Sequence, residues 1–535
     1  MGAFNSSPAM DVREILLSTS DSEDGSDSET NYALIFQRLI RRYGSSLTPN
    51  PPGEGFVMSQ RRPRIKKFKP NTAKLDASEF YYMTKMDAGL GTCIDKSGVN
   101  VATLLKEREC GKFRNETFSN YKRCRIANNY IPNKMGIFDH YDGKVFCGTF
   151  SEDGEYFITA SQEHVIRVYK TNNGDYELIQ RLNARDVGWS VIDVAFSPNN
   201  ENFIYSTWST SIHLCSVGGN PKKQEPLKLV NTARRFCVFS LAYSSDGQEI
   251  LGGANDGVMF IYNLERNRRT LKISAHDFDV NTVKFADHSS HIIYSGSDDG
   301  LIKVWDRRTF GEEVTSKPVG VFAGHQDGIT YIDAKGDGRY LISNSKDQSI
   351  KLWDVRMFST EEAMAETRRS IHEQTWDYRW QTVPKRLSSL PTITGDTSVM
   401  TYKGHVTTRT LIRARFSPLR NTGQRYIYTG CGSGRLIIYD ALTGKIAREE
   451  RKHSYCVRDV SWHPHYNEIF TSSWDGTVGR WYYASKDEKP IELCPVLRRS
   501  SRIASRNNNS TRPIVWEIRR AVEMERCTYP MRDPN

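Results

Sequence analysis

The chain has 535 residues, of which 38% are hydrophobic and 11% aromatic, so it can bury a large core and still carry polar tails. No stretch reaches the roughly 18 consecutive apolar residues of a membrane-spanning helix, and the N-terminus lacks a secretory signal. The 10 cysteines form no CxxC pair, which favours a reducing compartment. The net charge of +11 lies largely in short basic runs near the two ends.

Residues 1–85 are predicted to be largely disordered. The segment DSEDGSDSET at 21–30 mixes acids with serines and cannot bury enough apolar surface to fold. An amphipathic helix is predicted over 31–43, because apolar residues recur there at steps of three and four. They are Tyr32, Ile35, Phe36, Leu39, Ile40 and Tyr43. Residues 86–136 are expected to form a partly ordered lead-in.

A basic run follows that helix and is typical of a nuclear localisation signal, although a linker that binds phosphate loosely has the same composition. Its members are Arg61, Arg62, Arg64, Lys66, Lys67 and Lys69. The basic tail, 486–535, holds a second run from Arg498. We expect a nuclear protein and leave the cytoplasm open as a second compartment. Direct sequence-specific nucleic-acid binding is not expected, since no reading helix or zinc finger is found.

The middle of the chain is a repeat. Seven segments share one pattern: a strand ending in Ser or Thr, a tight turn, then a strand ending in an aromatic residue. Their turn positions are Glu163, Ser209, Asp256, Asp299, Asp347, Ser433 and Asp475. Successive gaps are 46, 47, 43, 48, 86 and 42 residues, and a period of about 40–45 residues is that of WD repeats. We therefore predict an all-β, seven-bladed propeller over 137–485.

Three repeats carry a complete set of polar anchors, in which a buried Asp needs donors from a His, a hydroxyl and an indole N–H. These anchors are His276, Ser295, Asp299 and Trp305; His325, Ser343, Asp347 and Trp353; and His453, Thr471, Asp475 and Trp481. Identical repeated sites indicate architecture, so we interpret them as structural. His140 precedes Glu163 by 23 residues, the interval from His276 to Asp299, so the first repeat is expected to begin there.

The one double gap predicts an insertion at 357–400, between the fifth and sixth repeats. TEEAMAETRRSIHEQ within it has the composition of a helix, and no eighth blade is evident. Trp376, Tyr378 and Trp380 follow that helix. Two interpretations stay open for these aromatic residues: they bind a partner, or they pack on the side of the propeller.

No catalytic motif is found: no phosphate-binding Gly loop, no GxSxG, no HExxH. We expect a protein that is not an enzyme and has no cofactor. His453, Cys456, His463 and His465 lie close together in sequence, but His453 already belongs to a blade and the last two flank a proline. We therefore expect no metal site there.

Two consecutive repeats end in Trp-Asp-x-Arg, as KVWDRRT and KLWDVRM. This pair resembles the motif of WD-repeat substrate receptors for cullin-4 RING ubiquitin ligases. Stretches such as RDVGWSVIDVAFSP and YLISNSKDQSIKLWDVR extend the resemblance over about 104–481, and several stretches of this kind are not part of the general repeat pattern. The string alone is a modest signal, since TWDYR also occurs within the insertion.

The resemblance implies that the motif arginines, on the bottom face of the propeller, bind the adaptor damage-specific DNA-binding protein one, and through it cullin-4 and a RING protein. By position the implied residues are Arg308 and Arg356, with Asp306, Asp354, Asp299 and Asp347 shaping the turn. It further implies that the chain recruits clients for ubiquitination and proteasomal degradation, with stress-response basic-leucine-zipper transcription factors among them. The alternative is a nuclear WD-repeat scaffold of an RNA-processing or chromatin complex.

Overall fold

The computed structural model describes residues 69–91, 101–110 and 118–485, apart from 173, 222, 231–235, 311–316 and 390. The predicted helix at 31–43, the acidic run, the tail 486–535 and the basic run up to Lys67 lie outside the described residues. Lys69, the last member of that run, lies inside them and is exposed.

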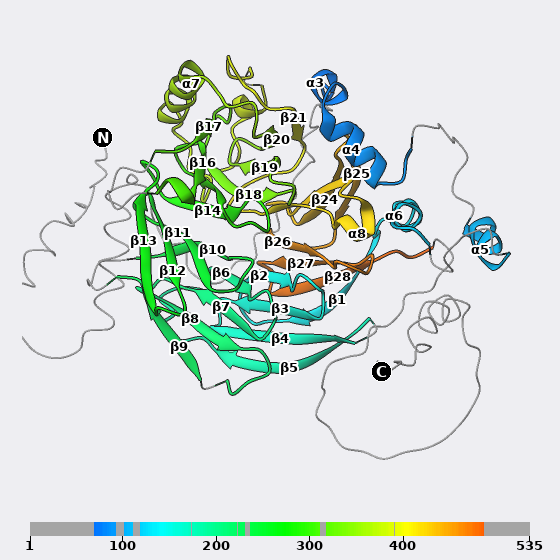
Figure 1. Cartoon of the computed structure of the whole chain (residues 1–535), viewed down its shortest axis with the longest axis horizontal. Helices are drawn as coiled ribbons and strands as arrows, with labels where there is room; N and C mark the ends of the chain where they lie inside the picture. Colours follow the sequence, from blue (N-terminus) through cyan, green and yellow to red (C-terminus); the bar gives the residue numbers. More distant parts are fainter. Residues whose placement is uncertain are drawn as a thin grey trace, which may run out of the picture. The chain divides into compact units, whose positions relative to one another are not determined.

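The described strands form seven four-stranded antiparallel sheets arranged around a central axis (Figure 1). The seven-bladed all-β propeller predicted from the repeat is therefore confirmed. Apolar and β-branched residues make the second strand of each blade almost fully buried on both faces, as in β19, where all six residues are buried. Each sheet packs its face on the next, so the core runs round the ring as a series of clusters.

The strands have the following bounds. Blade one holds β2 (Val145–Phe150), β3 (Tyr156–Ser161), β4 (Val165–Asn172) and β5 (Asp175–Asn183); blade two holds β6 (Asp193–Phe196), β7 (Asn202–Ser206), β8 (Ser211–Ser216) and β9 (Gln224–Lys228). Blade three holds β10 (Val238–Tyr243), β11 (Glu249–Ala254), β12 (Val258–Asn263) and β13 (Arg268–Ser274); blade four holds β14 (Val280–Phe285), β15 (Ile292–Ser297), β16 (Ile302–Asp306) and β17 (Gly320–Phe322). Blade five holds β18 (Ile329–Ala334), β19 (Tyr340–Ser345), β20 (Ser349–Asp354) and β21 (Met400–Lys403); blade six holds β22 (Ala414–Phe416), β23 (Tyr426–Thr429), β24 (Arg435–Asp440) and β25 (Ile446–Arg451). Blade seven holds β26 (Val457–Trp462), β27 (Ile469–Ser473), β28 (Thr477–Tyr482) and, from the start of the propeller, β1 (Lys134–His140).

The strand β1 closes the ring by pairing with β28, so the propeller begins three residues before the predicted 137. The expectation that the first repeat begins at His140 is wrong, because the anchor histidine position is taken by Tyr141, whose hydroxyl hydrogen-bonds Thr159 Oγ1. The interval that applies is 22 residues, as from His325 to Asp347, and counting 22 back from Glu163 gives Tyr141.

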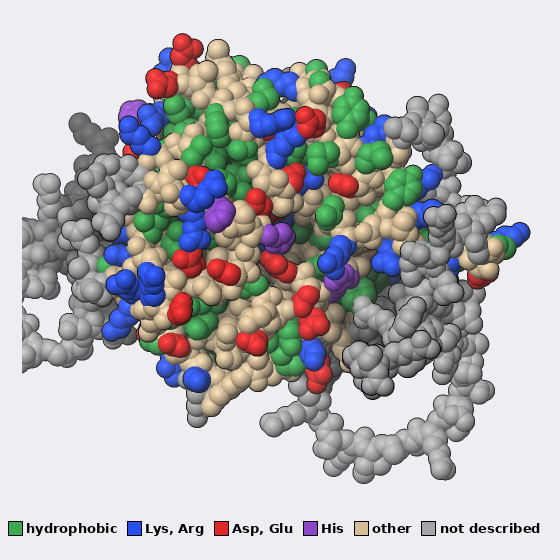
Figure 2. All heavy atoms as spheres, viewed as in Figure 1, with side chains coloured by type: hydrophobic (Ala, Val, Ile, Leu, Met, Phe, Trp, Pro, Cys, Tyr) green, Lys and Arg blue, Asp and Glu red, His purple; other side chains and the backbone are tan. Residues whose placement is uncertain are grey.

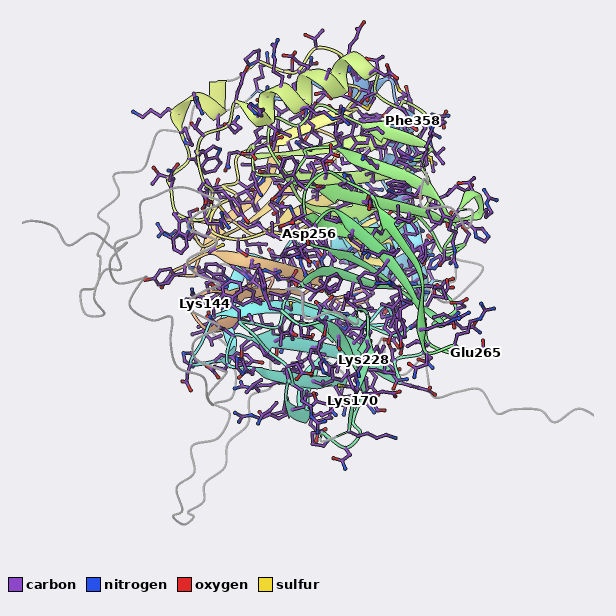
Figure 3. All side chains as sticks on the ribbon, turned by 90° about the vertical axis from the view of Figure 1, so that its left-hand side faces the viewer. Lys144, Lys170, Lys228, Asp256, Glu265 and Phe358 are labelled. Atoms are coloured by element: carbon purple, nitrogen blue, oxygen red, sulfur yellow. The ribbon has the colours of Figure 1, made fainter. Side chains whose placement is uncertain are left out.

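Turns alternate between two faces of the ring, because neighbouring strands are antiparallel. The first and third turns of a blade share one face, which we call the bottom face. The second turn and the connection to the next blade share the other, which we call the top face. In Figure 3 Glu265, on a third turn, lies at the right, and Lys144, on a connection between blades, lies at the left.

Short helices lie before and between the strands: α3 (Ala73–Asp76), α4 (Glu79–Asp87), α5 (Val101–Glu109), α6 (Asn120–Ala127) and α8 (Leu419–Thr422), with 3-10 turns at Arg307–Thr309 and Lys385–Ser389. No helix among the described residues is long and apolar enough to cross a membrane. The helix α4 docks on blades five and six through Phe80, which is fully buried with its ring 5.2 Å from that of Tyr340. The expected disorder of 1–85 is therefore wrong for 73–85, since the surface that orders this segment comes from residues more than 200 positions later.

The insertion contains α7 (Glu361–His372), as predicted, capped by the Thr360 hydroxyl. It leaves blade five at its third turn and returns as that blade's outer strand, so it lies within blade five and not between two blades. Gly300, at φ +70° on the top face of blade four, has no room for a side chain because Ile371 of α7 covers it. The insertion thus starts near Phe358 at the bottom, crosses the edge of the ring and reaches the top face (Figure 3).

Candidate functional site

Each complete anchor is one hydrogen-bonded chain across a blade. In blade four Trp305 Nε1 donates to Ser295 Oγ (2.8 Å), Ser295 Oγ contacts His276 Nε2 (2.7 Å), and His276 Nδ1 contacts Asp299 Oδ2 (2.7 Å). The same order recurs in Trp353, Ser343, His325 and Asp347, and in Trp481, Thr471, His453 and Asp475. The twelve residues that the repeat pattern identified therefore form three separate hydrogen-bonded sets, each of which stabilises one blade.

Burial sets the charge state of the anchor in blade four. Burial lowers the pKa of His276 despite the opposing charge of Asp299, so the ring is neutral. A neutral ring can donate from Nδ1 to the carboxylate and accept the serine proton at Nε2, which satisfies every polar atom of the chain. These histidines hold blades and have no free nitrogen for chemistry.

The two arginines of the candidate dock lie on the bottom face, directly after the third strands of blades four and five. Arg308 is 64% exposed and bonds Asp306 through two nitrogens, Nη2–Oδ2 at 2.7 Å and Nε–Oδ1 at 2.9 Å. Arg356 is 57% exposed and bonds Asp354 in the same way at 3.1 and 3.3 Å. In each turn the arginine N–H also donates to that Asp, at 3.0 Å.

This local geometry holds each guanidinium outward on a short, fixed turn. The side-chain hydrogen bond from Arg308 lowers the pKa of Asp306 to about 2, so the carboxylate is ionised throughout the neutral range. One edge of the guanidinium is used by the Asp, and the other edge of Arg308 faces solvent with N–H groups free for an acceptor on a partner.

Asp299 and Asp347 lie elsewhere. They sit on the second turns, on the top face, where each accepts from the backbone N–H two residues on and bonds its anchor histidine. A full strand, β16 or β20, separates them from the arginine turns. The expectation that they shape the docking turns is therefore wrong, and Asp306 and Asp354 alone do so.

A third copy of the motif shows what the string by itself encodes. In the insertion, Arg379 bonds Asp377 at 2.7 and 3.0 Å and donates its backbone N–H to it at 2.9 Å, as Arg308 does with Asp306. Yet Trp376 of this copy contacts Asp327 on the top face instead of a blade core. The Trp-Asp-x-Arg sequence therefore determines the local turn between Asp and Arg. The blade that carries it determines on which face of the propeller the arginine lies.

Sequence reasoning missed a carboxylate that reaches the dock. Glu79, at the start of α4, contacts Arg356 (Nη1–Oε1 3.4 Å) and also ion-pairs with Arg339 of blade five. Arg308 has no such partner among the described residues besides Asp306. The two arginines are thus unequal: one is open and the other is shared with an N-terminal helix. No local signal in the sequence links Glu79 to residues so far along the chain.

The aromatic residues of the insertion were expected either to bind a partner or to pack on the side of the propeller, and the structure shows examples of both packing and exposure. Trp376 donates its indole N–H to Asp327 (3.1 Å), and the ring of Tyr378 lies 4.2 Å from Lys346 Nζ, so both pack on the propeller. Trp380 is 72% exposed and remains available to a partner.

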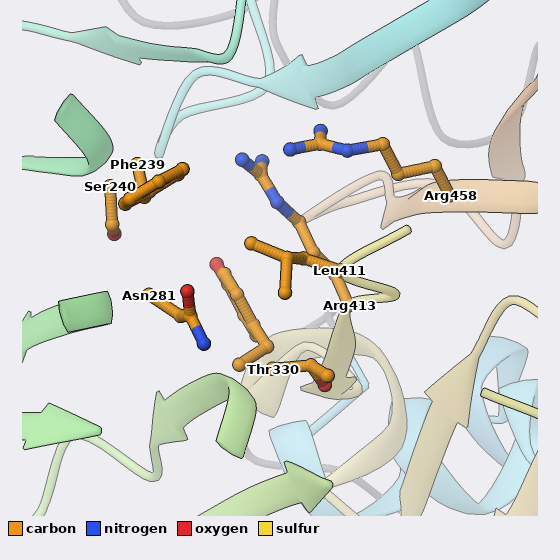
Figure 4. Close-up of a pocket in the computed structure, with 8 residues that line it drawn as sticks. Phe239, Ser240, Asn281, Thr330, Leu411, Arg413 and Arg458 are labelled. Carbon is orange, nitrogen blue, oxygen red and sulfur yellow. The ribbon is translucent and has the colours of Figure 1, made fainter. Parts of the chain in front are cut away.

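Buried ion pairs join the inner strands of different blades near the axis of the ring. The pocket drawn in Figure 4 is lined in part by Arg413 and Arg458. Arg413 pairs with Asp193 (2.6 Å) and Asp459 (2.9 Å), and all three side chains are buried. These groups are bound to one another and hold the inner strands together. On the face that Figure 2 shows, acidic and basic side chains are intermixed, which does not form the single basic stripe of a duplex-binding surface.

A ring of seven WD blades with two braced, outward-facing Trp-Asp-x-Arg arginines on one face defines a WD-repeat propeller protein. A family model for the WD domain, G-beta repeat, matches residues 133–170, 267–306, 316–354 and 444–481. Relatives that extend over most of the chain narrow this class further.

The chain is 39% identical over 379 residues to the "DDB1- and CUL4-associated factor 11 homolog" of Caenorhabditis elegans, covering 69% of this chain and 66% of the relative. It is 39% identical to the "LEC14B protein" of Lithospermum erythrorhizon, covering 73% of this chain and 83% of that relative. It is 37% identical to the "LEC14B homolog" of Prunus armeniaca, covering 76% and 86%. The chain belongs to this family of DDB1- and CUL4-associated factor 11 homologs and LEC14B proteins. The resemblance inferred from the sequence is thereby confirmed, and the chain spans just under two thirds of the C. elegans relative.

Proposed function

We propose that this chain is a substrate receptor of a cullin-4 RING ubiquitin ligase and that Arg308 and Arg356 bind the adaptor of that ligase. The observation that carries the proposal is the pair of braced, exposed arginines on neighbouring blades of one face. The name of the C. elegans relative, which associates it with DDB1 and CUL4, agrees with it.

The mechanism is positional. The adaptor holds the bottom face, the client binds elsewhere on the rigid ring, and the client lysine is thereby held near a conjugating enzyme carried by the RING protein. The gain in rate comes from raised effective concentration and not from an acid, base or nucleophile of this chain. A rigid propeller suits this task because it fixes the distance between two binding faces.

Co-purification of the double variant Arg308→Ala plus Arg356→Ala tests the proposal. Exposed surface arginines contribute little to folding, so the free energy of unfolding should stay within about 1 kcal/mol of the wild type. Loss of an anchoring interface arginine costs about 2 kcal/mol or more, so adaptor and cullin-4 recovery should fall at least about tenfold.

Arg379→Ala is the matched control. It removes an arginine with the same Asp-x-Arg bonding from the top face, and adaptor recovery should be unchanged. Normal adaptor recovery with the double variant, or recovery of an RNA-processing or chromatin complex in place of the ligase, would overturn the proposal.

We also propose that the protein acts in the nucleus and that its clients include stress-response basic-leucine-zipper factors. Six basic residues between Arg61 and Lys69 support nuclear import. Replacing all six by Ala should reduce nuclear accumulation, and an unchanged distribution in cells would remove this part. Client stability should rise in cells that carry the Arg308→Ala plus Arg356→Ala variant.

A further inference from the structure

Aromatic side chains gather on the top face, opposite the arginine dock. Trp189, on the connection from blade one to blade two, is 46% exposed, and Tyr455, on the connection from blade six to blade seven, is 54% exposed. Trp474 lies on the second turn of blade seven and is half-buried. The buried ring of Phe146 lies beneath, 5.3 Å from Trp189 and 5.6 Å from Trp474, and joins the two indoles into one apolar surface.

Two cations border these rings. Lys144 Nζ lies 4.5 Å from the ring centroid of Trp474, and the Arg409 guanidinium lies 5.8 Å from that of Tyr455. Among the described residues neither cation forms an ion pair with a carboxylate. Burial, and then the positive charge of Arg409, lower the pKa of Lys144. Two unpaired like charges held over aromatic rings favour the approach of an anion.

Arg409 is held in place at a cost. Its backbone lies at φ +73°, a region that few residues other than glycine adopt. The insertion offsets this strain with a hydrogen bond, because the carbonyl of Tyr378 accepts the Arg409 N–H at 2.7 Å. Tyr378 is itself fixed by its ring contact with Lys346. A strained cation braced by an insertion that the other blades lack indicates a positioned binding group.

We infer that Trp189, Trp474, Tyr455, Lys144 and Arg409 form a binding surface for an acidic client peptide, which we call the cationic aromatic surface. Carboxylates of the peptide bind Lys144 and Arg409, and an apolar side chain between them lies on the two indoles. This rests on the proposed function, in which the bottom face holds the adaptor and the client binds elsewhere on the ring. The insertion then completes the cationic aromatic surface, because it holds Arg409 in place.

Charge favours a peptide over a single-stranded nucleic acid, which also stacks on aromatic residues. Asp142 shares a connection with Lys144, and Asp186 shares one with Trp189, and both carboxylates are exposed. A continuous phosphate backbone would pass these acids, whereas a peptide can place its few carboxylates at the two cations alone. Phosphate tracking requires a longer row of cations than two.

The test is fluorescence anisotropy on the purified full chain, with a fluorescein-labelled dodecapeptide of glutamate, leucine and serine. Lys144→Glu plus Arg409→Glu should weaken binding at least about tenfold. Lys170→Glu plus Arg266→Glu changes the charge equally at two exposed positions, one near the end of β4 and one on the third turn of blade three, and should leave binding unchanged. Trp189→Ala removes a half-exposed ring whose core contact is with Phe146, and it should weaken binding with only a small loss of melting temperature.

Peptides with glutamine in place of glutamate, or serine in place of leucine, should each bind at least about tenfold more weakly than the parent. Equal binding by both double variants, no binding by the wild type, or tighter binding of labelled oligouridylate would each overturn the inference. The proposed function is scored separately, since Lys144→Glu plus Arg409→Glu should still recover the adaptor from cells. Loss of the adaptor with Arg308→Ala plus Arg356→Ala and normal peptide binding would support both.

Discussion

The hydroxyl of Ser295 hydrogen-bonds two ring nitrogens, one of a tryptophan and one of a histidine. It accepts from Trp305 Nε1 and contacts His276 Nε2, and all three groups are buried. Ser295→Ala would leave both nitrogens unsatisfied, so we expect the free energy of unfolding to fall by about 1–3 kcal/mol. Urea unfolding measures this. Ser289→Ala, at an exposed position of the same blade, should change it by less than about 0.5 kcal/mol.

Buried histidines also give the chain an acid-sensitive window. Burial lowers the pKa of His405 from 6.5 to about 4, where its ring contacts Tyr439 and Asn344, and burial does the same to His463. Because each folded-state pKa lies below the unfolded value, the unfolded chain takes up the proton first. Stability should therefore be lost as pH falls from 6.5 to 4, by up to about 1.4 kcal/mol per pH unit for each ring.

Urea midpoints across that pH window measure this loss. His405→Gln cannot titrate, so its stability should fall less steeply with acid than that of the wild type, whatever its stability at neutral pH. Equal slopes for the two proteins would show that His405 does not carry the effect.

At the scale of elements, the sequence could predict a strand or helix when residues close to it in the chain stabilise it, and could not when distant residues do. The strands and their turns repeat every forty-odd residues, so Asp299 and Asp347 marked true turns. The helix α7 carries its own cap and terminal charges, and its composition alone indicated it. The helix α4 also has a capping serine, Ser78, but it was not predicted because the surface that orders Phe80 lies in blades five and six. The pairing of Glu79 with Arg356 is invisible for the same reason.

The docking of α4 can be tested by a single side chain. Phe80 is fully buried, with its ring against Tyr340 and Phe416, and replacing such a ring by Ala typically costs about 3–5 kcal/mol. Because the helix lies outside the blades, Phe80→Ala should release α4 while the propeller melts nearly unchanged. Trypsin cleavage at Lys85 under native conditions should become much faster. Tyr82→Ala, at a ring 60% exposed, should leave the rate unchanged.

At the scale of the whole molecule, the ring has one seam. Every blade except the seventh is made of consecutive strands, and the seventh is completed by β1, which pairs with β28 at six positions. The seam is also fixed sideways: Asp139 of β1 ion-pairs with Arg167 of blade one, and Phe138 packs against Phe157 and Phe470 on either side. We therefore expect closure of this seam to help hold the two faces at a fixed separation.

A chain that starts at residue 143 should lose the seam, while one that starts at residue 118 keeps it. Removing β1 exposes the edge of β28 and the apolar surface under Met135 and Phe138, which we expect to cost about 3 kcal/mol or more. The shorter chain should melt earlier and in more than one step, because the end blades are no longer coupled. Calorimetry measures both features. A peptide of residues 132–142 added in trans should restore a single transition, and a scrambled peptide should not. If the two chains melted alike without peptide, ring closure by β1 would contribute nothing, and the rigidity that the two-face mechanism needs would have to come from the contacts between blades alone.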